Sequence, residues 1–596
     1  MGVAVRGYNP GVNGTPLRLC GLALALLCVA APAGAQNQAP ELPSGWTPKK
    51  AISTSHDMVA AANPLAVAAG HDILTQGGTA IDAAIAVQMV LNLVEPQSSG
   101  IGGGAFLLFH NGRNGLLTAY DGRETAPSSA KPDRFLDRDG KPLEFYAAVV
   151  GGRSVGVPGT LRMLELAHRQ YGKLPWEKLF APAITLAERG FAVSRRLHTL
   201  IAEDQHLTQD RARAYFFNAD GTPLAVGQVL KNPAFAATLR RIAAEGADAF
   251  YKGEIARDIV ETVRSHTRNP GDITEADLAG YKPKVREPVC GRYRIYKLCG
   301  MPPPSSGGIT LLQILAMLEP FNLRALGAES LMSVHLFSEA GSLAYADRNL
   351  YLADPDFVPT PAGLTDRTYL RERSALIRLD TSLGHAKAGT PPGRRMEAPK
   401  AADAGVREPL EFPSTSHISI VDKYGNAVAM TTTIEAAFGS RLMTGGGYLL
   451  NNELTDFSFV PVDDGRPVAN RVEASKRPLS SMAPTIVYDQ KGRVYMVVGS
   501  AGGSAIINHV AKTLVGVLDW NLDPQAAIDL PNVGSRNGPI ELEKDTGAVA
   551  LEPKLKALGH DTRVGVDTSG LQAIVRTRQG WIGGADPRRE GTVAGH

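Results

Sequence analysis

Two threonines of one predicted β-hairpin stand where a nucleophile and a partner hydroxyl could act together. Two runs of residues favoured in strands, 417–421 and 427–431, flank the turn-like segment 422–426. Equal counting outward from the middle of the turn places Thr415 opposite Thr433. A cut before Thr415 would free its α-amine, and an N-terminal threonine can use that amine as the base for its own hydroxyl. The pair therefore predicts nucleophilic catalysis that follows cleavage of the chain.

Three further clusters of small and polar residues follow this hairpin. Glu453 and Asp456 lie close together after a glycine-rich turn, and Ser480 is adjacent to Ser481. The run G-S-A-G-G-S at 499–504 follows a predicted strand, so its backbone N–H groups could form an anion-binding nest. Each cluster alone is typical of a turn. Together with the hairpin they offer acceptors for an ammonium group, donors for a carboxylate and an oxyanion hole.

The sequence contains partial matches to other catalytic and cofactor motifs, but the elements around them are not those that such sites require. The run G-I-G-G-G-A at 100–105 fits G-x-G-x-x-A, but a predicted helix precedes it and a strand follows, the reverse of a dinucleotide site. The S-x-x-K match at 128–131 lacks the K-T-G element of penicillin-interacting serine enzymes. The sequence contains no G-x-S-x-G elbow and no H-E-x-x-H. It therefore predicts no cofactor and no metal in the reaction.

The composition argues against several partners. The 596 residues carry a formal net charge of +3, which gives no electrostatic reason to bind nucleic acid or an anionic membrane surface. Aromatic residues make up 6% of the chain, too few to favour a stacking platform for bases. We therefore expect no nucleic acid among the partners.

The first 35 residues have the pattern of a secretory signal peptide. Arg6 and Arg18 precede the apolar run 19–31, and A-G-A at 33–35 forms a small-residue cleavage site. We expect cleavage after Ala35 and a periplasmic or secreted mature protein. An uncleaved anchor is the alternative, but the run is shorter than the roughly 20 residues that span a bilayer. No later run is apolar for long enough, so we expect no stable membrane span in the mature form.

The first elements after this segment are helices and then strands. Thr79 and Asp82 predict a capping box that opens a helix. Two short strands are predicted at 105–109 and 116–121, and Arg123 follows the second one directly.

The chain then changes character at one boundary. Residues from about 161 to 280 are predicted to be mainly helical, whereas the chain beyond Thr415 is rich in strand patterns. Between them, residues 386–411 are rich in proline, glycine and charge, which predicts an exposed linker. Thr415 therefore lies just past the clearest boundary in the sequence.

Cys290 and Cys299 are the two cysteines that remain after the signal segment. They lie in a predicted hairpin whose turn is near Arg294, and equal counting sets them across from each other. In an oxidising compartment this arrangement favours a disulfide, with two buried thiols as the alternative. A metal site is disfavoured because no second Cys or His pair accompanies them.

A series of motifs resembles one known family, the γ-glutamyltransferases (γ-glutamyl transpeptidases or glutathione hydrolases). Its members here, in order, are G-I-G-G-G-A-F, D-G-R-E-T-A-P, M-P-P-P-S-S-G-G, T-S-H-I-S-I-V-D-K-Y-G-N-A-V-A, L-L-N-N-E-L-T-D-F-S, K-R-P-L-S-S-M-A-P-T and G-S-A-G-G-S. The resemblance implies an α+β fold, the four-layer αββα sandwich of N-terminal-nucleophile hydrolases. It also implies a proenzyme that cleaves itself between Ser414 and Thr415. The large subunit 36–414, mainly helical, and the β-rich small subunit 415–596 would remain associated as a heterodimer.

The resemblance also implies the role of each site residue. Thr415 would attack the γ-glutamyl amide of glutathione or its conjugates, and water or an amino acid or peptide acceptor would release the glutamyl group. Thr433 would orient Thr415. The substrate and the oxyanion would be bound as follows: the α-carboxylate by Arg123, Ser480 and Ser481, the α-ammonium by Glu435, Glu453 and Asp456, and the oxyanion by the backbone N–H groups of Gly502 and Gly503.

Two departures from the family pattern bear on specificity. Many members have asparagine at the position of Glu435 and glutamine at that of Glu453, so this pocket is expected to be more acidic. The segment between Phe457 and Lys476, which is a lid in some members, is short and lacks tyrosine. Two alternatives stay open: an acylase of the same fold acting on glutaryl or cephalosporin-type substrates, and a non-catalytic exported binding protein.

Overall fold

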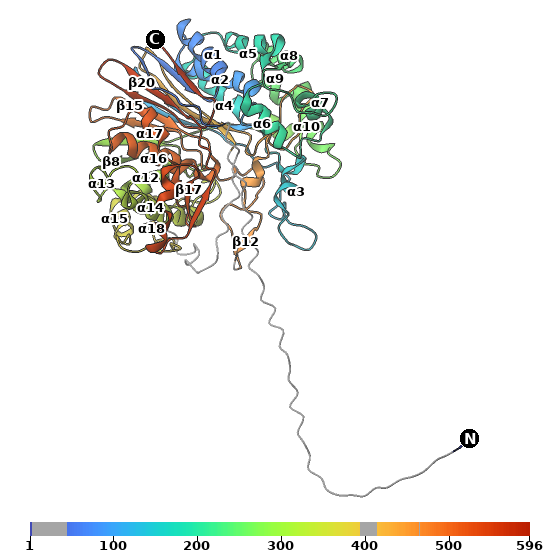
Figure 1. Ribbon diagram of the computed structural model, residues 1–596. Coiled ribbons are helices and arrows are strands. Elements are labelled where there is room, and N and C mark those ends of the chain that lie inside the picture. The colour runs from blue at the N-terminus through green and yellow to red at the C-terminus, as the bar shows by residue number, and fades with distance from the viewer. Residues whose placement is uncertain (3–44, 394–413, 464) are drawn as a thin grey trace. The chain divides into compact units, whose positions relative to one another are not determined.

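Two antiparallel sheets of seven strands each form the centre of the computed structural model (Figure 1). The structure describes residues 1–2, 45–393, 414–463 and 465–596, and the elements below belong to the compact unit Pro40–His596. Most of the expected signal segment, from residue 3 on, and most of the expected linker, from residue 394 on, lie outside the described residues.

One of the two sheets contains the predicted hairpin, and the other sheet faces it. The sheet with the hairpin has the order β21-β2-β10-β11-β3-β4-β7, formed by Thr592–Ala594, Met58–Ala61, Thr415–Val421, Ala427–Thr433, Gly104–His110, Leu117–Gly122 and Lys284–Arg286. The facing sheet has the order β1-β20-β19-β15-β14-β9-β8, formed by Ile52–Thr54, Trp581–Ala585, Gln572–Arg576, Val494–Gly499, Thr485–Tyr488, Tyr296–Gly300 and Val289–Tyr293.

Helices cover the outer face of each sheet. Along β11, Val428 and Met430 belong to the core shared with the first group of helices, whereas Ala427 and Ala429 belong to the core shared with the facing sheet. Strand side chains alternate between faces in this way, so both faces of β11 are buried. The first group is α1 (Pro64–Thr75), α2 (Ala80–Val94), α4 (Thr160–Tyr171), α5 (Ala181–Arg189) and α8 (Pro233–Glu245), and the second is α12 (Gly307–Leu318), α14 (Leu331–Tyr351), α16 (Ile506–Leu518) and α17 (Pro524–Asp529). The layers are helix, sheet, sheet and helix, which confirms the predicted αββα sandwich.

The hairpin of β10 and β11 has the predicted register. Thr415 pairs with Thr433 at one end and Val421 pairs with Ala427 at the other. Asp422 closes the turn, because its carboxylate accepts the backbone N–H groups of Tyr424 and Asn426, both at 2.9 Å. Turn chemistry and strand length together set the register, and the register sets which residue faces Thr415.

Strands from before and after Thr415 are interleaved in the sheet. The hairpin is flanked by β2 on one side and β3 on the other, and both of these precede the expected linker. Further along, β21 from the end of the chain pairs with β2. A cut before Thr415 would therefore leave two polypeptides joined by continuous sheet hydrogen bonds.

Local predictions outside the hairpin can also be compared with the structure. The capping box of Thr79 and Asp82 is present at the start of α2, as predicted. Cys290 on β8 pairs with Cys299 on β9, and a disulfide joins them. Within the described residues, no helix is both long and apolar enough to cross a membrane.

Candidate active site

Three oxygen atoms form a hydrogen-bonded chain at the start of β10. The Thr415 hydroxyl donates to Thr433 Oγ1 at 3.2 Å, and the Thr433 hydroxyl donates to the carbonyl oxygen of Ser414 at 2.9 Å. The backbone N–H of Glu435 also donates to Thr433 Oγ1, at 2.8 Å, which holds that hydroxyl in place. The hairpin thus brings a candidate nucleophile and a bridging hydroxyl into contact with the peptide carbonyl that precedes the nucleophile.

Two residues that the sequence did not single out hold this peptide from outside the hairpin. Ser414 Oγ donates to the carbonyl oxygen of Gln97 at 2.7 Å, and Arg589 Nη1 donates to the carbonyl oxygen of Thr415 at 2.8 Å. Burial lowers the pKa of Arg589 to about 10, against the opposing charge of Glu95. Arg589 is still cationic at neutral pH, so a positive charge lies beside the backbone of Thr415.

Arg123 is the cation of a buried ion cluster. Its guanidinium pairs with the carboxylates of Glu453 and Asp456 and donates to the carbonyl oxygen of Leu479 at 2.7 Å. Burial alone would lower the pKa of Arg123, but the two facing carboxylates raise it above its ordinary value. A permanent positive charge and two acids therefore lie together, as the predicted contacts to a carboxylate and an ammonium group require.

Glu435 lies on a strained part of the backbone at the same site. Its φ angle is +77°, in the left-handed region where glycine and asparagine are favoured. Its carboxylate accepts a hydrogen bond from the side-chain amide of Asn452. A non-glycine residue in this conformation usually marks a functional site, because the surrounding structure must hold it there.

A fourth carboxylate, that of Glu124, was not predicted. Burial raises the pKa of Glu124 to about 8, although the charge of Arg123 opposes the shift. Burial likewise raises the pKa of Glu453 well above its usual range against Arg123, and the like charges of Glu124 and Glu435 add to the rise. The cluster therefore retains a proton near neutral pH, which limits its excess negative charge.

A loop and a helix from the part of the chain before Thr415 position Ser480 and Ser481. The Ser306 hydroxyl and backbone N–H both donate to the Ser480 carbonyl oxygen, at 2.7 Å. Arg348 on α14 donates from Nη2 to Ser481 Oγ at 2.7 Å and from Nε to Ser306 Oγ at 2.9 Å. The motif M-P-P-P-S-S-G-G thus supports the two predicted serines, and Arg348 is a positioning residue that no local sequence signal marks.

Gly502 and Gly503 form the tight bend between β15 and the helical segment that leads into α16. Both have positive φ angles, +136° and +56°, and a Cβ on Gly502 would lie 2.6 Å from the ring of His509. Since the first N–H groups of a helical segment have no partner inside it, the amides of this bend can point at an anion. The assignment of these two amides to an oxyanion hole stays a prediction.

One small cavity is lined by residues of every predicted group. Apart from Gly502, the structure places all the residues assigned to catalysis and substrate binding on its wall. Two apolar residues, which sequence reasoning missed, complete the lining. The lining is Arg123, Thr415, Thr433, Glu435, Glu453, Asp456, Ser480, Ser481, Met482, Gly503 and Ile506.

The layers, the hairpin and this cavity define an N-terminal-nucleophile hydrolase, which is an enzyme class. Comparison with known proteins then gives the family. Residues 66–596 match the family model described as gamma-glutamyltranspeptidase, and the chain belongs to that family. It is similar to the glutathione hydrolase proenzyme of Bacillus subtilis (strain 168), with 38% identity over 580 residues that cover 96% of this chain and 97% of the relative.

Acylases are also among the similar proteins. The chain is 36% identical to the acylase ACY 1 proenzyme of Pseudomonas sp. (strain SE83), over 90% of this chain and 93% of that protein. The solved cephalosporin acylase of Bacillus halodurans superposes with a TM-score of 0.79 at 27% identity, covering 94% of this chain and 99% of that one. Overall similarity therefore does not separate the two kinds of substrate, and the choice depends on the site residues.

Proposed function

We propose that this chain is the proenzyme of an exported γ-glutamyltransferase and glutathione hydrolase that cleaves itself between Ser414 and Thr415. The observation that carries the proposal is the hydrogen-bonded chain from Thr415 through Thr433 to the Ser414 carbonyl oxygen. It ends on the peptide bond to be cut, and the cavity beside it contains Arg123 and a group of carboxylates. A self-cleaving nucleophile and a binding site for an amino acid group thus lie together.

Self-cleavage begins with attack of Thr415 Oγ1 on the carbonyl carbon of Ser414. As the hydroxyl proton passes toward Thr433, the Thr433 hydroxyl stabilises the negative charge that develops on the Ser414 oxygen. The C–N bond then breaks, the nitrogen takes up a proton, and an ester links Ser414 to the Thr415 oxygen. Water hydrolyses the ester, which leaves a carboxylate on Ser414 and a free α-amine on Thr415.

The mature reaction uses the same oxygen a second time. The α-amine of Thr415, whose ordinary pKa is about 8, accepts the hydroxyl proton as Oγ1 attacks the γ-carbonyl of the substrate. The amides of Gly502 and Gly503 bind the oxyanion, and the leaving amine takes up the proton. Water or the amine of an amino acid or peptide then attacks the γ-glutamyl ester and regenerates Thr415.

The charges of the cavity match the α-amino acid end of a γ-glutamyl group. Arg123, with Ser480 and Ser481, binds the α-carboxylate, because a planar guanidinium suits two parallel hydrogen bonds. Glu435, Glu453 and Asp456 bind the α-ammonium. A substrate that brings one charge of each sign leaves the ion cluster paired.

A glutaryl acylase is the second candidate, and the similarity to two acylases favours it. A glutaryl group has a carboxylate at the corresponding end but no ammonium. Its binding would add a negative charge to a buried site where the carboxylates of Glu453 and Asp456 already pair with Arg123. Because an unpaired buried charge is costly, the γ-glutamyl group is the preferred substrate.

The remaining parts of the proposal concern assembly and location. Residues 36–414 form the large subunit and residues 415–596 the small one, and the interleaved strands keep them together as a heterodimer. Residues 1–35 direct export to the periplasm or the medium. The short segment between Phe457 and Lys476 leaves the site open, so several acceptors can reach the γ-glutamyl enzyme.

A denaturing gel combined with two release assays tests the proposal. The wild type should give two bands and release glutamate from glutathione much faster than it releases glutarate from a glutaryl amide. Thr415→Ala should give one inactive band, whereas Ser416→Ala, which removes the neighbouring buried hydroxyl, should be cleaved and active. A persistent single band for the wild type would indicate the non-catalytic binding protein, and faster glutarate release would indicate the acylase.

A further inference from the structure

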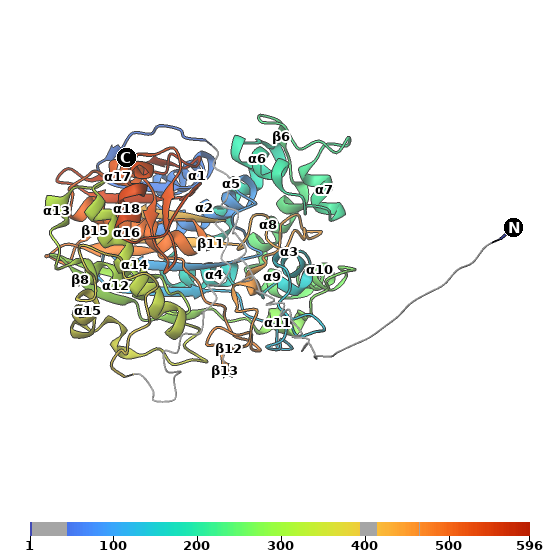
Figure 2. The same ribbon diagram turned by 60° about the horizontal axis from the view of Figure 1, so that its bottom comes forward.

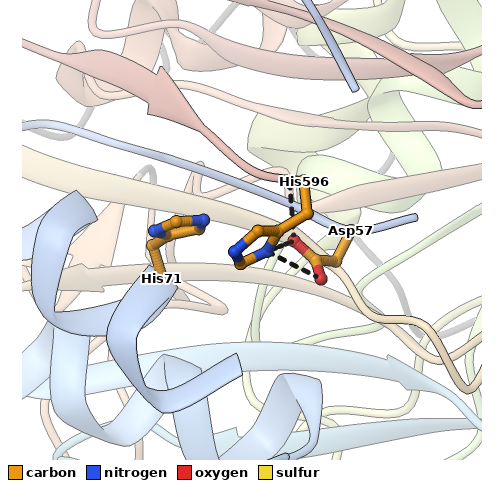
Figure 3. Close-up of side chains that lie close together, drawn as sticks. All are labelled: Asp57, His71 and His596. Atoms are coloured by element: carbon orange, nitrogen blue, oxygen red, sulfur yellow. Dashed lines mark hydrogen bonds and ion pairs between the residues drawn. The ribbon is translucent and has the colours of Figure 1, made fainter. Parts of the chain in front are cut away.

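Asp57, His71 and His596 gather at the end of the hairpin sheet that lies away from Thr415 (Figure 3). Asp57 precedes β2, whose Met58 pairs with Val421 at the turn end of β10. His71 is on α1, and His596 follows β21. Two nearby segments and the distant segment that contains His596 therefore meet here, at the opposite end of β10 from the candidate active site.

Asp57 contacts both the backbone and the ring of His596. Its Oδ1 accepts the backbone N–H of His596 at 3.1 Å and lies 3.2 Å from Nδ1 of the ring. The His596 carbonyl oxygen accepts the N–H groups of Ser55 and His56, both at 2.7 Å. With Nδ1 engaged by a carboxylate, the tautomer that leaves Nε2 with a free lone pair is favoured.

The two imidazole rings are stacked, and their Nε2 atoms make few contacts within the described residues. They stack with centroids 4.2 Å apart, and Figure 3 shows His71 beside the His596 ring with Asp57 on the other side of that ring. Nε2 of His71 is shielded from solvent and makes no hydrogen bond within the described part of the chain. Nε2 of His596 makes a long hydrogen bond, 3.4 Å, with Thr75 Oγ1. A shielded ring nitrogen without a partner is unfavourable, and a metal ion bound to it would remove that cost.

We propose that His71 and His596 bind a divalent transition-metal ion that prefers imidazole, such as Zn²⁺ or Cu²⁺, and that Asp57 positions the His596 ring for it. Imidazole nitrogens suit these ions, and a carboxylate on the far nitrogen of a ligating histidine is the usual supporting contact. The ligand atoms of the three residues already lie within 4.8 Å of one another. An imidazole binds an ion in its ring plane, and the ligands of a tetrahedral ion are about 3.3 Å apart. Because the two rings are stacked, binding requires the His596 side chain, which is 44% exposed, to turn out of the stack.

A second histidine cluster shows the contrast. His335 Nδ1 lies 2.7 Å from His560 Nε2, and His335 Nε2 donates to the Arg378 carbonyl oxygen at 2.6 Å. These nitrogens are occupied by each other and by the backbone, and both residues are buried. The cluster is satisfied as it stands, whereas the pair of His71 and His596 is not.

The proposed ion would join α1 to the end of the chain. Since β21 is the edge strand of the hairpin sheet and pairs with β2, binding should hold this edge in place. An ion that binds only the folded state raises its thermal stability. Because the site lies at the far end of β10, we expect little change in the rate of catalysis, and the inference does not depend on the proposed activity.

Calorimetric titration of Zn²⁺ into the metal-stripped, tag-free protein tests the proposal, with circular dichroism to show that each variant is folded. The wild type should bind one ion and melt at a higher temperature with it. His71→Ala and His596→Ala should each weaken binding at least about tenfold, and Asp57→Asn about 10- to 100-fold. His56→Ala, at the exposed neighbouring histidine, is the matched control and should bind as the wild type does.

Two results would overturn the proposal. One is the absence of saturable one-site binding to the wild type. The other is unchanged affinity in the folded double variant His71→Ala, His596→Ala, which would place any bound ion elsewhere. Wild-type affinity in Asp57→Asn would refute the positioning role of Asp57.

Discussion

Replacing Thr433 with valine tests the hydroxyl chain, because valine keeps the shape of the side chain and removes only its oxygen. That oxygen accepts hydrogen bonds from the Thr415 hydroxyl and from the Glu435 N–H, and it donates to the Ser414 carbonyl oxygen. The change therefore removes a side-chain donor from the carbonyl oxygen of the peptide bond to be attacked.

The expected loss follows from the role of that donor. Removing one donor to a developing oxyanion typically slows a reaction by about 10²- to 10³-fold, or about 2.7–4 kcal/mol of activation free energy. Loss of the bond that orients the Thr415 hydroxyl adds about 1 kcal/mol. We therefore expect self-cleavage of Thr433→Val to be slower than wild type by about three orders of magnitude.

The assay is a time course of purified precursor on a denaturing gel, and two variants serve as controls. Thr433→Ser retains the hydroxyl and should be cleaved within about tenfold of the wild-type rate. Thr432→Val removes a buried hydroxyl that has no hydrogen-bond partner in the described structure, so cleavage should be unchanged. Wild-type cleavage of folded Thr433→Val would refute the role of the hydroxyl chain.

Three further predictions concern the charges and the covalent bond around the site. Arg589→Met should shift the acidic limb of the kcat/KM profile to higher pH, because loss of a nearby cation raises the pKa of the Thr415 amine. Arg589→Lys keeps the cation and should leave the profile unchanged, and equal profiles for the wild type and both variants would refute the effect. Glu124→Gln removes a like charge beside Glu453, so Glu453 should lose its proton at a lower pH than in the wild type. KM for glutathione, measured from pH 6 to 8, should therefore begin to fall at a lower pH in the variant, and an unchanged or opposite shift would contradict this. Replacing both residues of the Cys290–Cys299 disulfide by serine should lower stability by about 2–3 kcal/mol, seen as a lower melting temperature, whereas an unchanged Tm would show that the short loop contributes little.

Local patterns were enough to predict the hairpin and its pairing. The turn residues and the two strand runs are contiguous, so counting from the turn gives the register that places Thr415 against Thr433. The cap of α2 was predictable for the same reason, because Thr79 and Asp82 are three residues apart and act on each other. In both cases the interacting groups are neighbours in the sequence.

Residues that reach the site from distant segments carried no such signal. Arg589 is 174 residues from Thr415 in sequence, and only the end of the chain folding back behind β10 brings it to the Thr415 carbonyl. Glu124 is next to Arg123 in a motif that was recognised, yet its burial among other carboxylates depends on the packing of segments from both parts of the chain. Such contacts follow from tertiary packing, which local periodicity does not encode.

Peptide mapping of an acid-quenched reaction with a γ-glutamyl substrate tests the central claim most directly. The claim is that the protein frees Thr415 by its own cleavage and then uses it as the nucleophile. We predict a small polypeptide that begins at Thr415 and, during turnover, carries one glutamyl group on its N-terminal peptide. A different N-terminus, or a glutamyl group on any other peptide, would contradict the account.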